Sequence, residues 1–178
     1  MTTDENQPPM DMRARDVQPA LRMFHRVLGA DLLAVRQALI DMRTRFDGHV
    51  ADDALGRIEL VLAEVLNNIV EHGARRVTDR AGTASGVSIH LTVTRHDGGL
   101  ACAVTDNGRP LPLDCLITPD KLATPEAAAM RDGGFGWYMI RDLTQSLFYY
   151  REGGRNVLCF NVPRHGPERR ARGRRDVA

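Results

Sequence analysis

The sequence predicts an α+β fold, a two-layer α/β sandwich in which helices cover one face of a mostly antiparallel sheet. Two observations lead to this prediction. Apolar residues recur at helical spacing through much of residues 31–73, and the pattern then changes to the alternation typical of strands. The later strands are separated by short glycine-containing turns, which join antiparallel neighbours. Helices that precede and interrupt hairpin-connected strands indicate this layered architecture.

The first elements are a strand and two helices. Residues 23–28 predict a short edge strand, which could pair across a homodimer. Asp31 is a suitable N-cap for a helix that continues to about residue 45. A second helix is predicted over residues 53–72, and Gly73 follows it as a C-terminal glycine.

The second part of the chain predicts a sheet interrupted by one helix. Residues 75–86 are polar and predict a loop, and a helix follows Gly136. The continuous apolar run at 100–105 is typical of a central strand. The remaining strand predictions cover residues 87–93, 147–150 and 157–162, the last two forming a hairpin around residues 152–154.

Composition and charge narrow the class of protein. The 178 residues are 43% apolar and 26% charged, which suits one soluble domain with a sizeable core. The net charge of +1 predicts no direct nucleic-acid partner and no membrane partner. No apolar run approaches about 18 residues, and no signal core is present, so we expect a cytoplasmic protein. The cysteines form no C-x-x-C pair, which indicates a reducing compartment: Cys102, Cys115 and Cys159.

The domain boundaries follow from changes in composition. Residues 1–19 are polar and aperiodic, and we expect them to be disordered. Residues 20–164 hold all the periodic segments and form the predicted domain. Residues 165–178 form an arginine-rich tail without aromatic residues, more typical of a solvated end than of a nucleic-acid arm.

The second predicted helix carries a polar stripe. Glu64, Asn68 and Glu71 share one face because residues four and seven apart lie above one another on an α-helix. An Asn oxygen can be a ligand of Mg²⁺, and a Glu can deprotonate an attacking hydroxyl. The alternative is a solvated polar face with Arg57 as ion-pair partner.

Two further segments suit a nucleotide. Asp106 follows an apolar strand, where a carboxylate can accept a hydrogen bond from the amine of adenine, and Gly108 permits close approach of the base. The alternative is a plain Asp-Asn-Gly turn. Residues 133–136 are Gly-Gly-Phe-Gly before a helix, which suits phosphate binding or a loop that needs positive φ angles.

The segment between these two motifs, residues 111–132, is long for a connection and predicts an active-site lid. Lys121 lies in it and could reach phosphate, although a solvated surface lysine is the simpler reading. Thr124 suggests a short helix start within the segment. The chain has no P-loop motif, so the nucleotide site would be of another kind.

Together these motifs resemble the GHKL ATPase superfamily, which includes gyrase and histidine kinases, and most closely its anti-sigma-factor serine/threonine kinases. The resemblance covers about residues 21–163. The matching motifs are Glu64-x-x-x-Asn68 with His72-Gly73, Asp106-x-Gly108-x-Pro110, Gly134-x-Gly136 with Tyr138-Met139-Ile140, and the hairpin from Gly153 to Leu158.

The resemblance implies a histidine-kinase-like ATPase fold and assigns roles to residues. Glu64 would be the catalytic base, Asn68 the Mg²⁺ ligand, and Asp106 the adenine-binding carboxylate. The nucleotide loops would contain Gly108, Gly134, Phe135 and Gly136. The chain departs from the family at Asn156, where many relatives have threonine near the adenine, and in a divergent lid that begins at residue 112.

By resemblance, the chain is an ATP- and Mg²⁺-dependent anti-sigma factor with serine/threonine protein kinase activity. Its partners would be an anti-anti-sigma (antagonist) protein, which it phosphorylates, and a sigma factor. One alternative is a nucleotide-dependent switch module that does not transfer phosphate. Another is a detached histidine-kinase ATPase domain, for which His25 and His49 are poorly placed acceptors. A nucleotide-free scaffold would fail to bind ATP.

Overall fold

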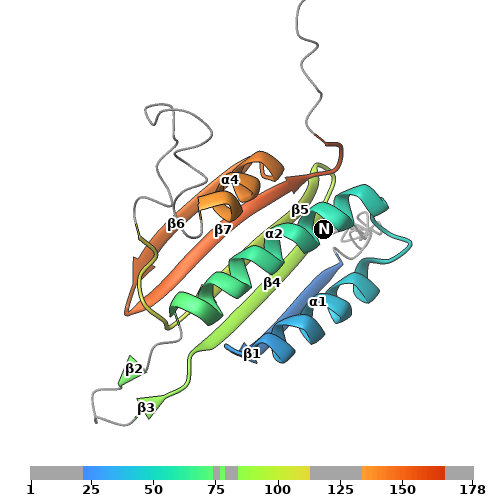
Figure 1. The fold of residues 1–178 in the computed structure, drawn as a ribbon. Helices are drawn as coiled ribbons and strands as arrows, with labels where there is room; N and C mark the ends of the chain where they lie inside the picture. Colours follow the sequence, from blue (N-terminus) through green and yellow to red (C-terminus); the bar gives the residue numbers. More distant parts are fainter. Residues whose placement is uncertain (1–21, 74–76, 79–83, 113–133, 167–178) are drawn as a thin grey trace, which may run out of the picture.

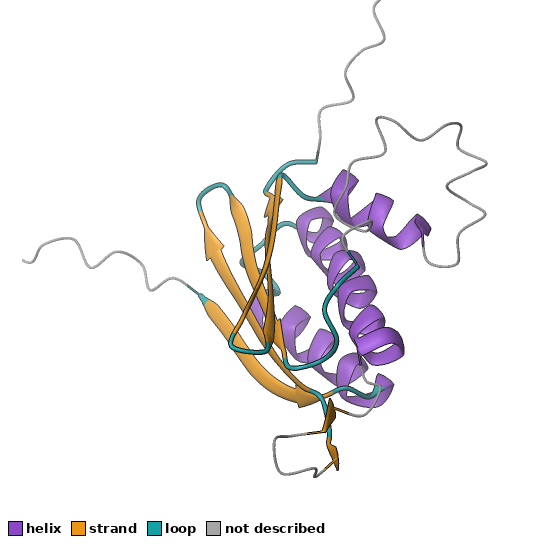
Figure 2. Cartoon of the chain, turned by 90° about the vertical axis from the view of Figure 1, so that its left-hand side faces the viewer, coloured by secondary structure: helices purple, strands orange, loops and turns teal. Residues whose placement is uncertain are grey.

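The structure is a computed structural model that describes residues 22–73, 77–78, 84–112 and 134–166. Its centre is a five-stranded antiparallel sheet in the order β1-β4-β5-β7-β6. Helices α1, α2 and α4 lie side by side on one face of this sheet, with α2 in the middle (Figures 1 and 2). The predicted α+β architecture is confirmed.

Strand β1 (Met23–Gly29) forms one edge of the sheet, and α1 (Leu32–Phe46) follows it. The helix begins as predicted, because the Asp31 carboxylate accepts a hydrogen bond of 2.8 Å from the Ala34 amide. Its buried residues recur at helical spacing and face the sheet: Val35, Ala38, Met42 and Phe46.

Helix α2 (Asp52–Asn68) continues into a π-helical turn, η1 (Ile69–Gly73), so the predicted helix differs in its last turn. Ile58, Leu62 and Val65 are buried against the core, as their spacing predicts. A π turn advances by a smaller angle per residue than an α-helix, so the α-helical stripe does not continue through it. Glu71 lies in this π turn and is exposed, whereas Glu64 and Asn68 on α2 are half-buried.

The hairpin predictions are confirmed with slightly longer strands. β4 (Ser88–His96) and β5 (Gly99–Asp106) form one hairpin, and β6 (Ser146–Glu152) and β7 (Arg155–Pro163) form the other. β5 is the central strand. Gly153 and Gly154 have φ angles of 56° and 81°, which a tight two-residue turn requires and which glycine tolerates.

The segment predicted as a polar loop contains paired strands. β2 (Val77–Thr78) and β3 (Ala84–Ser85) form a separate two-stranded antiparallel sheet. Each strand has only two residues, which is too short to produce an alternating pattern in the sequence.

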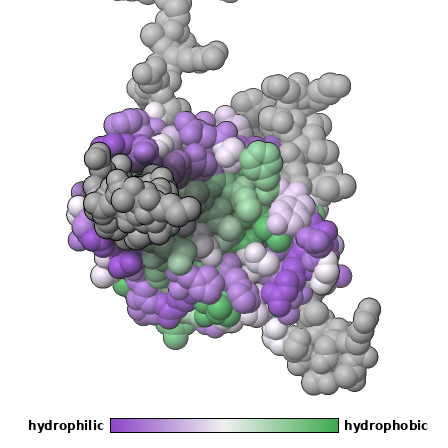
Figure 3. Space-filling model, turned by 180° about the vertical axis from the view of Figure 1, so that it is seen from behind, coloured by the Kyte–Doolittle hydropathy of each residue, from purple (hydrophilic) through white to green (hydrophobic). Residues whose placement is uncertain are grey.

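The core fills the space between the helices and the sheet. α4 (Gly134–Leu143) begins three residues earlier than predicted and buries Trp137 and Ile140 in the core. The opposite face of the sheet is not covered by a helix among the described residues, and hydrophobic side chains gather on it (Figures 2 and 3). Its exposed large residues lie on the two edge strands: Met23, Val27, Phe148 and Tyr150.

Several predictions concern residues outside the described ranges. These are the disordered segment 1–19, most of the lid and of the arginine-rich tail, Lys121, the helix start at Thr124, and Cys115. Cys102 and Cys159 carry free thiols, and burial raises the pKa of both. Within the described part of the chain, no helix combines the length and hydropathy needed to cross a membrane.

Candidate functional site

The predicted motifs converge at one end of the sheet, although they are far apart in the sequence. The end of α2 meets the loop after β5, where the Arg109 amide donates a 3.4 Å hydrogen bond to the Gly73 carbonyl. The middle of α2 meets the start of α4, where Gly136 lies against the Glu64 carboxylate. Three short motifs that are separately weak thus border one region of the molecule.

Gly136 leaves room for the side chain of Glu64. A Cβ atom at this position would collide with Oε2 of Glu64, and it would lie 3.2 Å from the carboxyl carbon. The atoms it would meet belong to the flexible end of the Glu64 side chain, so a larger residue here would displace the Glu64 carboxylate rather than separate the two helices. The packing places the half-exposed Glu64 carboxylate beside the first turn of α4.

Asn68 lies one turn beyond Glu64 and has an unsatisfied donor. Its amide nitrogen Nδ2 is buried and makes no hydrogen bond with any described residue. A buried donor without a partner costs about 1–3 kcal/mol, so such groups are rare outside ligand sites. The position therefore suits a ligand that presents oxygen acceptors.

Asp106 lies at the end of β5 and is 4% exposed. Its Oδ1 accepts two hydrogen bonds, one of 2.7 Å from the Gly108 amide and one of 2.8 Å from Nδ2 of Asn156. Burial raises the pKa of the Asp106 carboxyl, while the hydrogen bonds from Asn156 and Gly108 and the charge of Arg151 oppose that rise. The residue is both a turn former and a buried carboxylate.

The loop after Asp106 is fixed from several directions. The side chain of Asn107 accepts a 2.7 Å hydrogen bond from the Ser88 amide at the start of β4. A Cβ added to Gly108 would lie 2.8 Å from Oδ1 of Asp106 and 3.0 Å from the Gly73 carbonyl oxygen. Gly108 is thus required for the close contact between this loop and the end of α2.

Asn156 belongs to the site, but its role is not evident from the sequence. It is 5% exposed and lies directly opposite Asp106 in the β5–β7 register. The hairpin pattern identifies the strand that carries Asn156, but a pattern of alternation does not fix which residues pair across two strands. Only the register brings its side chain to the carboxylate.

The family model of the histidine kinase-like ATPase domain matches residues 14–162. The chain belongs to the histidine kinase-like ATPase family. A crystal structure of the RsbU and RsbW domains of Rv1364c from Mycobacterium tuberculosis is similar, with 14% sequence identity and a TM-score of 0.49. The similarity covers 79% of this chain and 32% of that chain, so the chain spans about a third of that protein's length. No curated protein matches the chain.

An ATPase domain implies that the chain binds ATP, and the site has features that fit a triphosphate. The first turn of α4 contains Gly134, Phe135 and Gly136. The first backbone N–H groups of a helix have no partner within it, and they favour anions. The Asn68 amide, which no residue in the described ranges pairs with, adds a side-chain donor on the neighbouring helix α2.

The side chains present also fit a Mg²⁺ ion that is bound together with a nucleotide. Among the described residues, no group of three or more His, Cys, Asp or Glu side chains could hold a metal. Mg²⁺ commonly takes one or two protein oxygens and completes its shell with phosphate oxygens and water. Asn68 can supply such an oxygen, with ATP supplying others.

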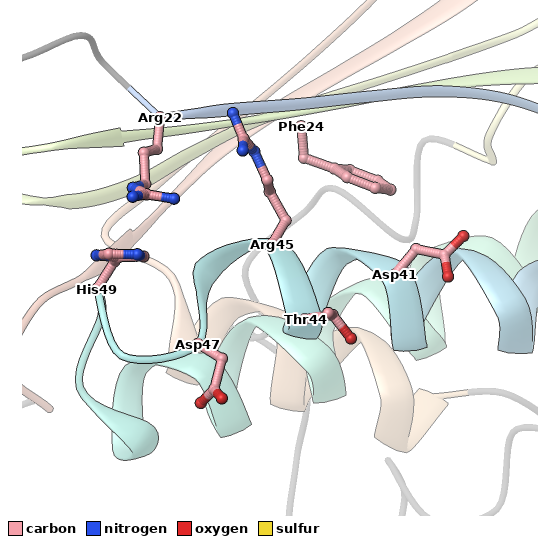
Figure 4. Close-up of a pocket in the computed structure, with 7 residues that line it drawn as sticks. All are labelled: Arg22, Phe24, Asp41, Thr44, Arg45, Asp47 and His49. Carbon is pink, nitrogen blue, oxygen red and sulfur yellow. The ribbon is translucent and has the colours of Figure 1, made fainter.

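A hollow lies away from these motifs, between β1 and the end of α1 (Figure 4). It has a volume of about 490 Å³, and Arg22 and His49 face one another at one side of it. None of the predicted site residues lines it. The lining residues carry both signs of charge: Arg22, Phe24, Asp41, Thr44, Arg45, Asp47 and His49.

Proposed function

We propose that this ATPase-family domain is an anti-sigma factor with serine/threonine protein kinase activity. In this proposal it transfers the γ-phosphate of ATP to a hydroxyl group of an antagonist protein and binds a sigma factor in the alternative state. The observation that carries the kinase part is the position of Glu64, whose carboxylate packs against Gly136 at the start of α4. A domain that only binds nucleotide has no need of a carboxylate there.

The proposed mechanism assigns one task to each side chain. Asp106 accepts a hydrogen bond from the exocyclic amine of adenine, and Gly108 lets the base lie close to the backbone. The N–H groups of the first turn of α4 hold phosphate oxygens. Glu64 takes the proton from the attacking serine or threonine hydroxyl, which makes that oxygen a better nucleophile for the γ-phosphorus. The bond from the γ-phosphorus to its bridging oxygen breaks, and ADP leaves.

Asn68 would hold Mg²⁺ through its amide oxygen. The ion, when bound, neutralises charge on the phosphate oxygens. Because a carboxylate base needs its lone pair, Glu64 is proposed to stay outside the metal shell and to face the incoming hydroxyl. The two residues are four positions apart on α2 and so share a helix face.

The test is transfer of radiolabelled γ-phosphate from ATP to proteins that co-purify with the full chain from native cytosol. Serine and threonine phosphates survive acid, whereas phosphohistidine is hydrolysed, so acid treatment of the labelled product separates the two kinase classes. Acid-stable label on a small partner supports the proposal. Binding of ATP and partner without any labelled product would instead favour the switch module, and acid-labile label the histidine-kinase alternative.

A further inference from the structure

The side chain of Asn156 is saturated with hydrogen bonds. Its Nδ2 donates to Oδ1 of Asp106 and to the Arg109 carbonyl, both at 2.8 Å. Its Oδ1 accepts from the Tyr149 hydroxyl at 2.9 Å and from Nη1 of Arg151. An amide has two donor hydrogens and two acceptor lone pairs, so no capacity is left for a ligand.

The hydrogen bonds of Asn156 orient the Asp106 carboxylate. Both hydrogen bonds to Asp106, from Asn156 and from Gly108, end on Oδ1. A carboxylate with one oxygen held by two donors, one from the loop after β5 and one from β7, cannot rotate freely about its terminal bond. Its other oxygen, Oδ2, is therefore presented in a fixed direction, which is what recognition of a planar base requires.

The same network holds the backbone of the loop that follows Asp106. The Leu111 amide donates a 3.0 Å hydrogen bond to the Tyr149 hydroxyl, and Nη1 of Arg151 donates at 3.1 Å to the Gly108 carbonyl. Asn156 joins these contacts through its bond to the Arg109 carbonyl. Strands β6 and β7 therefore fix residues 108–111 at several successive backbone groups.

We propose that Asn156 is a positioning residue of the nucleotide site, which holds Oδ1 of Asp106 and the backbone of residues 108–111 in place and makes no contact with ATP. This inference rests on the proposed assignment of Asp106 to adenine. It differs from the expectation set by relatives with threonine near the base, because here the side chain's hydrogen-bonding capacity is fully used within the protein. Tyr149 assists by connecting Asn156 to Leu111.

The pH dependence of ATP binding can distinguish a positioning role of Asn156 from a purely structural one, because Asn156 affects the pKa of Asp106. The charged group that acts on the Asp106 carboxyl is Arg151 of β6. Asn156 of β7 and the Gly108 amide donate hydrogen bonds to it. The end of η1 presents the Gly73 carbonyl to the adjacent loop. Removing the amide of Asn156 takes away a bond that lowers the Asp106 pKa. The pH below which ATP binding is lost should then move upward, because binding needs the ionised carboxylate.

The experiment measures ATP affinity by calorimetry between pH 4.5 and 8 for the full chain and three variants. For Asn156→Ala we expect about tenfold weaker binding at pH 7.5, equivalent to about 1.4 kcal/mol, and an upward shift of the acid midpoint. Tyr149→Phe removes only the hydroxyl and should weaken binding about threefold. Asn161→Ala is the matched control, since Asn161 lies on the same strand but bonds to His96 and Gln145, and it should bind ATP normally.

Amide hydrogen exchange without nucleotide gives a second measurement. The Gly108 and Leu111 amides should exchange faster in Asn156→Ala than in the wild type, and Leu111 alone in Tyr149→Phe. Failure of the wild type to bind ATP would sink the proposed function together with this inference. Normal ATP affinity, an unshifted acid midpoint and unchanged exchange in Asn156→Ala would overturn this inference alone. If Asn156→Ala does not fold, Tyr149→Phe decides by the same two measurements.

Discussion

The two sides of the candidate nucleotide site differ in how many of their polar side-chain atoms are hydrogen-bonded within the protein. On the side of β5 and β7, the amide of Asn156 is fully hydrogen-bonded and Asp106 is held by two donors. On the side of α2, the amide nitrogen of Asn68 is buried without a partner among the described residues. One side is complete without ligand, and the other carries a donor that no described residue satisfies.

This difference suggests a division of tasks. A saturated network around a buried carboxylate is rigid, and it can present that carboxylate to a flat base with little ordering at the moment of binding. An unpaired buried donor lowers the stability of the free protein and recovers that free energy when an acceptor arrives. The side of β5 and β7, which we call the base side, would therefore set which nucleotide base binds. The side of α2, the phosphate side, would respond to the phosphate charge of the nucleotide and to its metal ion.

Replacing Glu64 should separate chemistry from binding and give the largest effect. Glu64→Gln keeps the size of the side chain and its packing against Gly136 but removes the base. General-base assistance contributes about 10²–10⁴ in rate, so phosphate transfer to the antagonist should fall by about that factor while ATP affinity stays the same. Single-turnover transfer and calorimetry on the same preparations measure the two quantities.

Glu59→Gln is the control for that variant. Glu59 lies on the same helix, but its carboxylate pairs with Arg43 at 2.7 Å, away from the site. Its loss should leave the transfer rate unchanged, since exposed ion pairs contribute about 0–1 kcal/mol to folding. If Glu64→Gln transferred phosphate at the wild-type rate, Glu64 would not be the base.

Asp106→Asn should weaken the binding of ATP. The substitution removes the charge that would accept the adenine amine, and it places an amide where Asn156 and Gly108 both donate. Loss of a charge-assisted hydrogen bond costs about 1.5–3 kcal/mol, so ATP should bind more than tenfold more weakly. Asp97→Asn, at the opposite end of β5 and exposed, is the matched control. Equal affinity of Asp106→Asn and wild type would remove Asp106 from the adenine site.

Periodicity is sufficient to predict the elements that carry the site. The helix with Glu64 and Asn68, the strand that ends at Asp106 and the hairpin around Gly153 and Gly154 all follow from local patterns. Such patterns depend on short-range geometry, which each segment retains wherever it lies in the fold. The order of helices and hairpins was therefore enough to indicate the sheet and its covered face.

Register and unusual helix geometry were not predictable in this way. Asn156 meets Asp106 only because β5 and β7 pair in one particular register, and nothing local to either strand fixes it. Glu71 lies in a π turn at the end of α2, and nothing in the apolar periodicity of this segment distinguishes a π turn from a further α-helical turn. The paired residues of β2 and β3 are likewise too few to leave a pattern.

Gly108→Ala should disrupt the contact between the loop after β5 and the end of η1. The added Cβ would lie within 3.0 Å of both Oδ1 of Asp106 and the Gly73 carbonyl oxygen, and a backbone oxygen cannot move without shifting the end of η1. Overpacking of this kind costs about 1–3 kcal/mol, so the melting temperature should fall and ATP affinity should fall with it. Gly86→Ala is the control because its Cβ would meet nothing within 4 Å. Normal stability of Gly108→Ala would mean that the loop and η1 are not in tight contact.

Asn68→Ala should change the free energy of unfolding of the ligand-free protein least, and the expected change is stabilising rather than destabilising. The substitution removes a buried donor that has no partner in the described part of the chain, so the free energy of unfolding without ligand should stay the same or rise by about 1 kcal/mol. With saturating ATP and Mg²⁺ the order should reverse. Ligand at 100 times its dissociation constant stabilises a protein by about 2.7 kcal/mol, and the variant should lose the Mg²⁺-dependent part of this gain. Asn67→Ala, one residue earlier on α2, should retain it. Thermal melts with ATP, with and without Mg²⁺, measure both effects, and an undiminished Mg²⁺-dependent shift in Asn68→Ala would show that the metal is held elsewhere.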